Sequence, residues 1–257
     1  MRYFIETSYK GNAYSGFQVQ QNSNTIQAEV EKALTVFFKR SFALTGSSRT
    51  DAGVNALQNY FHFDAEKELA QDLKTERSSR LSGLEKSTYH LNAILPPDIV
   101  IKRIFRVADD AHCRFDAVSR EYQYFIYKNK DPFLEDRAYY FPYVTDIGKL
   151  RECADIILLH KDFTSFSKKN TQVHNFICDI KHSEWTEGKN TLIYSVKSNR
   201  FLRGMVKALV GTMLRVATQK ISVDEFKNII ESRDCAGADF SVPSHGLFLV
   251  KVAYPDF

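Results

Sequence analysis

Two segments that alternate in polarity like β-strands constrain the fold of this chain most. They lie at 2–8 and 120–128, and a period of two is typical of a strand with one buried face. An amphipathic helical pattern follows each of them, at 24–38 and at 146–160. Because strands and short helices mix along the chain, we expect an α+β fold with an antiparallel sheet.

The remaining expected elements give both parts of the chain a rough order of strand, helix, strand and strand. In the first part we expect strands at 41–45, 56–63 and 99–107, with a surface helix and loop in the polar residues 64–90. In the second part we expect strands at 174–186, 191–198 and 246–253, and helices at 201–217 and 222–232. The order predicts two domains, at 1–108 and 109–257.

Finer patterns predict how some of these elements begin and which way they face. Asn24 is followed three residues later by Gln27, and Ser222 by Glu225, which is the spacing of a helix-capping box. The strand at 56–63 should place three apolar side chains on one face, namely Leu57, Phe61 and Phe63.

The composition excludes several classes of protein. Hydrophobic residues make up 44% and charged residues 26%, as in a globular protein. The four cysteines form no CxxC, the seven histidines form no HExxH, and no phosphate-binding glycine loop occurs. We therefore expect no metal and no nucleotide cofactor.

The same sequence predicts a location away from the membrane. No apolar stretch approaches the roughly 20 residues that span a bilayer. The first residues lack the apolar run of a signal peptide, and scattered cysteines suit a reducing compartment. We expect a cytoplasmic protein without a membrane partner.

The loop from Gly46 to Gly53 is the segment most indicative of chemistry. Its serines and glycines predict a tight connection between two strands, and Gly53 permits a positive φ close to Asp51. Arg49 could hold the Asp51 carboxylate by charge-assisted hydrogen bonds. Asp and Arg in a turn also commonly cap backbone amides. Both a reactive carboxylate and a purely structural turn therefore fit the pattern.

Two further segments favour contact with nucleic acid. Residues 197–220 contain no Asp or Glu and six basic residues, namely Lys197, Arg200, Arg203, Lys207, Arg215 and Lys220. Arg200, Arg203 and Lys207 are spaced three and four residues apart, which would place them on one helix face and suits phosphate contacts, although charged faces are often simply solvated. On the strand at 120–128, Tyr122 and Tyr124 share one side, where a tyrosine could stack on a base or pack in the core.

Taken together, these segments resemble the tRNA pseudouridine synthase A family over nearly the whole chain. Eight stretches carry the resemblance in order: Tyr9–Gly11 with Tyr14–Gln18, Arg49–Val54, Leu91–Ile99, His112–Phe115, Arg120–Tyr124, Asp162–Phe166, Phe201–Gly211 and Gly246–Tyr254. The resemblance implies two similar α/β halves, ferredoxin- or RRM-like, that form one continuous antiparallel sheet with a central basic cleft. It also implies a homodimer that needs neither metal nor cofactor and converts uridine to pseudouridine at positions 38–40 in the anticodon stem-loop of tRNA.

The resemblance also implies roles for single residues. Asp51 matches the family's essential aspartate, and Tyr122 matches the tyrosine that stacks on the uracil. Arg203 and Lys207 match cations of a basic helix that favour the ionised carboxylate, and Arg49 would help to hold the flipped nucleotide. We expect further RNA contacts at Lys197, Arg200 and Arg215.

Departures from the family's motifs keep alternatives open. Asn55 and Gly204 stand where histidines are usual, Lys207 replaces an arginine, and Lys10 replaces the aspartate of the opening motif. A catalytically weak or inactive RNA-binding paralogue, or a synthase acting on another RNA site, would fit these changes. A carboxylate hydrolase needs paired carboxylates. Asp64 is the only acid near Asp51 in the sequence, and this reaction leaves the basic segment unexplained.

Overall fold

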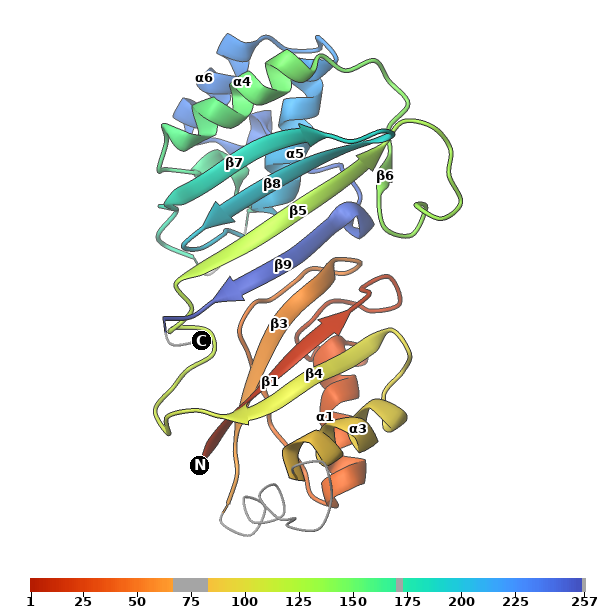
Figure 1. Ribbon diagram of the computed structural model, residues 1–257. Helices are drawn as coiled ribbons and strands as arrows, with labels where there is room; N and C mark the ends of the chain where they lie inside the picture. Colours follow the sequence, from red (N-terminus) through yellow and green to blue (C-terminus); the bar gives the residue numbers. More distant parts are fainter. Residues whose placement is uncertain (67–82, 170–172, 256–257) are drawn as a thin grey trace. The chain divides into compact units, whose positions relative to one another are not determined.

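The protein is described by a computed structural model that covers residues 1–66, 83–169 and 173–255 (Figure 1). Its backbone contacts divide the chain into two compact units. Unit 1 comprises Met1–Val118 and Lys251–Phe257, and unit 2 comprises Ser119–Val250. That 1–108 and 109–257 are two folding domains stays a prediction.

Unit 1 is built on three antiparallel strands with β1 (Arg2–Tyr9) in the middle. β3 (Asn55–Asp64) and β4 (Ile99–Arg106) flank it, and the two-residue strand β2 (Thr45–Gly46) pairs with β3. The helices α1 (Ile26–Phe38) and α3 (Gly83–Ile94) pack on each other, and α3 packs on β4. The strands expected at 56–63 and 99–107 and the helix at 24–38 are thus confirmed. The strand expected at 41–45 is wrong, because only Thr45 of that range is paired.

Two finer expectations in unit 1 are also wrong. Thr25, not Asn24, caps α1: its side chain accepts a hydrogen bond from the Ala28 amide at 3.3 Å. Phe61 and Phe63 are buried, but Leu57 is 46% exposed. The pairing of β1 with β3 shifts register between Thr7 and Tyr9, and such a bulge reverses the alternation of faces along the strand.

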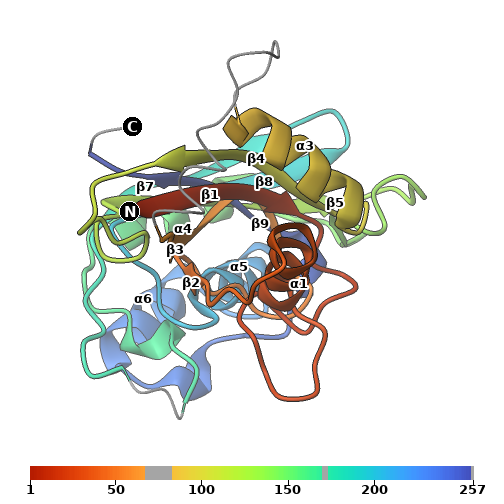
Figure 2. The same ribbon diagram turned by 90° about the horizontal axis from the view of Figure 1, so that it is seen from below.

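Unit 2 is also built mostly on antiparallel strands. β8 (Thr191–Ser198) lies between β5 (Ser119–Tyr127) and β7 (Ile180–Glu187) in antiparallel pairing, and β6 (Tyr139–Tyr140) pairs in parallel with β5. Figure 2 shows α4 (Ile147–Leu158), α5 (Met205–Ala217) and α6 (Val223–Ser232) on one side of these strands. The capping box of Ser222 and Glu225 is confirmed. Residues 174–179, expected to be part of a strand, precede β7 and are not in it.

The last strand, β9 (Leu247–Ala253), begins in unit 2 and ends in unit 1. In unit 2, the ring of Phe248 packs edge-on against Phe125, with 5.1 Å between the centroids. In unit 1, the Val252 amide donates a hydrogen bond to Oε1 of Gln58 at 3.1 Å. The expected class is confirmed as mixed α/β with mostly antiparallel strands.

Helix α5 differs from the expected cationic helix. It starts at Met205, so Arg200 and Arg203 precede it, and the expectation that they share a helix face with Lys207 is wrong. The reason is Gly204, whose φ of +75° lies outside the helical region. Most of α5 is buried, including Leu209 and Met213. None of the helices in the described ranges is long and apolar enough to cross a membrane.

Candidate active site

In unit 1, hydrogen bonds hold the loop residues that precede Asp51. Before it, the Ser47 amide donates to the carbonyl oxygen of Tyr60 at 2.8 Å, and the Asn59 side-chain amide donates to the carbonyl oxygen of Ser48 at 2.9 Å. Next to Asp51, the hydroxyl groups of Tyr9 and Thr50 are hydrogen-bonded at 2.8 Å. The backbone that carries Asp51 is therefore fixed by β1 and β3.

The backbone of residues 11–17 also packs against this loop. The Phe17 amide donates to the carbonyl oxygen of Thr50 at 3.1 Å, next to Gly16 with its φ of +114°. A Cβ on Gly11 would lie 2.1 Å from the carbonyl oxygen of Val54, so only glycine fits there. The Gly11 amide also donates to Oδ1 of Asn55 at 2.9 Å. Asn55, one of the departures from the family's motif, thus has a structural contact in this chain.

The side chains of the loop differ sharply in exposure. Ser48, Thr50 and Val54 are buried, whereas Arg49 is exposed and Asp51 is partly exposed. Gly53 has a φ of +78°, as expected for the turn that follows. Ser48 and Thr50 therefore anchor the loop in unit 1, while Arg49 and Asp51 keep part of their side chains exposed.

In unit 2, the two tyrosines of β5 have different surroundings. Tyr124 is fully buried and its hydroxyl donates to the carbonyl oxygen of Pro243 at 2.7 Å, and burial raises its pKa. Tyr122 is partly exposed and meets Phe201 edge-to-face, with centroids 5.0 Å apart and planes at 83°. Tyr124 is thus a core residue, whereas Tyr122 keeps part of its side chain exposed.

The cations expected to bind RNA are spread over unit 2. Arg203 and Lys207 lie near the start of α5, where Nζ of Lys207 donates to Oγ of Ser244 at 3.3 Å. Arg215 lies in the last turn of α5, about 15 Å along the helix axis from Met205 at 1.5 Å per residue. Its guanidinium donates to the carbonyl oxygen of Gly237 at 2.8 Å. The structure therefore brings Arg203 and Lys207 to one end of α5 and Arg215 to the other.

The two remaining cations lie at the end of β8. Lys197 is directly opposite Glu121 of β5 in the sheet register. Arg200 follows two residues after the strand, and its amide donates to Oγ of Ser198 at 3.4 Å. Both stay predictions as RNA contacts, and so do the roles of Asp51 and Arg49 in unit 1 and of Tyr122 in unit 2.

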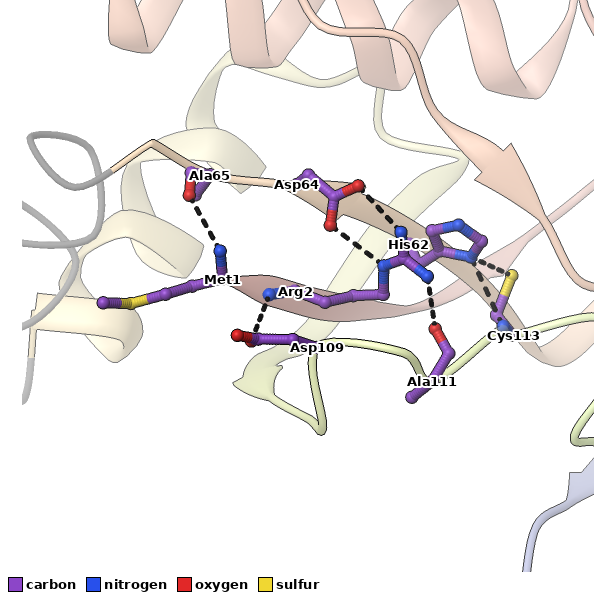
Figure 3. Close-up of polar contacts among 8 residues, drawn as sticks. All are labelled: Met1, Arg2, His62, Asp64, Ala65, Asp109, Ala111 and Cys113. Carbon is purple, nitrogen blue, oxygen red and sulfur yellow. Dashed lines mark hydrogen bonds and ion pairs between the residues drawn. The ribbon is translucent and has the colours of Figure 1, made fainter.

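Sequence reasoning missed a polar cluster of unit 1, which Figure 3 shows. Arg2 donates to both carboxylate oxygens of Asp64, at 2.9 and 2.8 Å, and to the carbonyl oxygen of Ala111 at 2.9 Å. The Cys113 amide donates to Nδ1 of the buried His62 at 3.3 Å. Burial, helped by the charge of Arg2, lowers the pKa of His62 to about 4. The only sequence signal was the His112–Phe115 stretch.

This cluster connects to the candidate loop through Tyr254. Its hydroxyl donates to the carbonyl oxygen of Cys113 at 2.5 Å and lies 3.2 Å from Oγ of Ser47. Ser47 is buried at the start of the loop that carries Asp51. Through Tyr254, the chain after β4 therefore supports the start of the loop. Within the described ranges, no three His, Cys, Asp or Glu side chains gather as a metal site.

Comparison with known proteins identifies the family of the chain. A family model described as tRNA pseudouridine synthase matches residues 160–255. The chain is 42% identical over 255 residues to tRNA pseudouridine synthase A of Bacteroides fragilis, covering 99% of this chain and 96% of that one. The chain belongs to the tRNA pseudouridine synthase A family. As a pseudouridine synthase it is an isomerase.

More distant members of the family cover the chain equally well. The tRNA pseudouridine synthase A of Parabacteroides distasonis is 38% identical over 255 residues, covering 99% of this chain and 96% of its own. That of Staphylococcus aureus is 34% identical over 254 residues, covering 98% and 90%. Because the matches run through both units, the loop of unit 1 and the start of α5 in unit 2 both lie within the family likeness.

Proposed function

We propose that the protein isomerises uridine to pseudouridine at positions 38–40 in the anticodon stem-loop of tRNA, with Asp51 as the essential carboxylate. One observation carries the role of Asp51: its partly exposed side chain directly follows Thr50, whose hydroxyl is buried and hydrogen-bonded to Tyr9 and whose carbonyl oxygen accepts a hydrogen bond from the Phe17 amide. The names of the relatives support tRNA as the substrate.

The reaction explains what a single carboxylate can do. The uracil must leave C1′ of its ribose, turn, and reattach through C5. A paired uridine must first be flipped out of the helix, which costs roughly a few kcal/mol. Contacts between cations and phosphates offset this cost, and Arg49 and Arg203 are candidates. Asp51 then acts either as the nucleophile or as the base.

Tyr122 is the proposed stacking partner of the flipped uracil. Its ring is partly exposed, and Phe201 supports it from the side. Stacking of a base on an aromatic side chain is worth about 1–3 kcal/mol. A rigid ring on a central part of β5 provides this energy with little loss of side-chain freedom.

The proposal includes what the resemblance implies for the whole molecule. This comprises two similar ferredoxin-like halves, a basic cleft, a homodimer and a cytoplasmic location. Further RNA contacts are proposed at Lys197, Arg200 and Arg215. Sedimentation of the purified chain tests the homodimer, since a monomer at working concentration contradicts it.

Release of tritium from tRNA labelled at C5 of uridine tests the activity, because C5 loses its hydrogen only when the new bond forms. Wild type is compared with Asp51→Asn and with Asp110→Asn, which removes an exposed carboxylate of the same unit. We expect release by wild type and Asp110→Asn and none by Asp51→Asn, with tRNA binding intact in all three. Release by Asp51→Asn would refute its role.

Two further outcomes separate the alternatives. Binding of tRNA without release by wild type would favour an RNA-binding paralogue or another RNA target. Release that reverse-transcription mapping places outside positions 38–40 would confirm the reaction and refute the proposed site in tRNA.

A further inference from the structure

A single turn of 3₁₀ helix in unit 2, at Ser244–Gly246, lies against the strand β5. Just before the turn, the hydroxyl group of Tyr124 donates to the carbonyl oxygen of Pro243 at 2.7 Å. At its end, a Cβ on Gly246 would lie 2.9 Å from the carbonyl oxygen of Phe125, so a larger residue there would displace the turn from the strand. Two consecutive residues of β5 therefore hold the turn at both of its ends.

The first residue of this turn contacts helix α5. Nζ of Lys207 donates to Oγ of Ser244 at 3.3 Å, and both residues are partly buried. Lys207 lies in the first turn of α5. On β5, Tyr122 precedes Tyr124 by two residues and lies on the same face of the strand. The anchored turn therefore connects the cation at the start of α5 to the strand that carries the candidate stacking tyrosine.

The two anchors of the turn do not involve the hydroxyl group of Ser244, since they are the carbonyl oxygen of Pro243 and the close approach of Gly246. For Lys207 this hydroxyl group matters more, because a lysine ammonium is a compact charge at the end of a flexible four-carbon stem. The ammonium has three donors, so a bond to one hydroxyl group leaves two donors for other acceptors. Unlike a carboxylate, a hydroxyl group orients the ammonium without cancelling its charge.

We propose that Ser244 is a positioning residue for the synthase reaction, whose hydroxyl group holds the ammonium group of Lys207 in a fixed place. The inference rests on the proposed function, with Lys207 in the role that the family resemblance gives it, a cation that favours the ionised carboxylate. Such a charge is most effective when it is in place before the reaction begins. Without the hydroxyl group, rotation about the bonds of the lysine stem would spread the ammonium over several positions. The reaction would then slow while tRNA binding stayed the same.

Three serine variants in the full chain test this inference. Ser244→Ala removes the hydroxyl group, and Ser244→Thr keeps it. Ser241→Ala is the matched control, because it makes the same change at an exposed serine of the same segment. Ser244→Ala is also combined with Lys207→Met, which removes the ammonium group. Thermal melting followed by circular dichroism checks folding, and we expect the serine variants to melt like wild type.

The readouts are the single-turnover rate of tritium release and the KM for tRNA. We expect Ser244→Ala to lower the rate about three- to tenfold, as for the loss of one hydrogen bond, with KM unchanged. Ser244→Thr and Ser241→Ala should keep the wild-type rate. In the Lys207→Met background, Ser244→Ala should cause no further loss, because no ammonium group is left to position.

The outcomes separate this inference from the proposed function. If wild type forms pseudouridine and Ser244→Ala matches its rate, the inference alone is refuted. An equal loss with and without the ammonium group of Lys207 would also refute it, since Ser244 would then act through another group. A rise in KM at an unchanged rate would make Ser244 an RNA contact and overturn the positioning role. A wild type that forms no pseudouridine in tRNA would refute the proposed function and this inference together.

Discussion

The buried histidine of unit 1 makes stability depend on pH in a predictable way. The Cys113 amide donates to Nδ1 of His62 at 3.3 Å, so this nitrogen must carry no proton in the folded state. Burial, then the charges of Arg2 and His112, lowers the pKa of His62 from 6.5 to about 4, while Asp64 and Asp116 oppose the change weakly. Protonation would remove an acceptor from a buried amide and place a charge beside Arg2.

The sign and size of the effect follow from linkage. Above pH 6.5 neither state binds the proton, so the stabilising contribution of neutral His62 is fully present. As the pH falls from 6.5 towards 4, the unfolded chain gains a proton that the folded chain does not, and stability is lost. The difference between 6.5 and about 4 corresponds to about 3 kcal/mol in total, of which about 2 kcal/mol is lost by pH 5.

Urea unfolding at pH 7 and pH 5, followed by far-UV circular dichroism, measures this loss in wild type and in His62→Gln. Glutamine offers an acceptor but does not titrate, so its free energy of unfolding should change by about 2 kcal/mol less between the two pH values. Trp185 lies in unit 2, and its fluorescence identifies any separate unfolding of that unit. An equal change in both proteins would refute the reasoning.

Two other substitutions probe the loop and the start of α5. Gly11→Ala places a Cβ about 2 Å from the carbonyl oxygen of Val54, so we expect a loss of about 1–3 kcal/mol in urea unfolding and slower tritium release. The exposed Gly148→Ala is its control, and an unchanged rate in Gly11→Ala would contradict the supporting role. Lys207→Met should lower the single-turnover rate more than the affinity for tRNA. Equal losses would instead make Lys207 a phosphate contact.

Local patterns in the sequence predicted the elements that are determined by neighbouring residues in the chain. The strand at 191–198 and the capping box of Ser222 and Glu225 are confirmed, because alternation and a three-residue spacing determine them. The helix predicted at 201–217 was given too early a start. The helical pattern of the sequence extends through Arg203, but Gly204 has a φ of +75° and interrupts the helix there. The prediction that Leu57 shares a face with Phe61 and Phe63 was wrong, because the bulge that changes its face arises from the pairing of β3 with β1.

The supports of the candidate site arise from contacts between residues far apart in the sequence. Tyr254 reaches Cys113 across 141 residues and Ser47 across 207, and no local pattern marks either contact. The loop from Gly46 to Gly53 could be singled out by its glycines, but the contacts that hold it could not.

The contacts that hold the loop bear on the two interpretations of Asp51. A structural turn needs only its own capping hydrogen bonds, and its side chains point wherever those bonds are satisfied. Here the backbone bonds go to Tyr60 and Phe17, and the bond of the Thr50 side chain goes to Tyr9. The loop is thus held by its surroundings. A loop backbone that is held in place before the substrate arrives requires less reorganisation during the reaction. This is why the proposed function assigns the chemistry to Asp51.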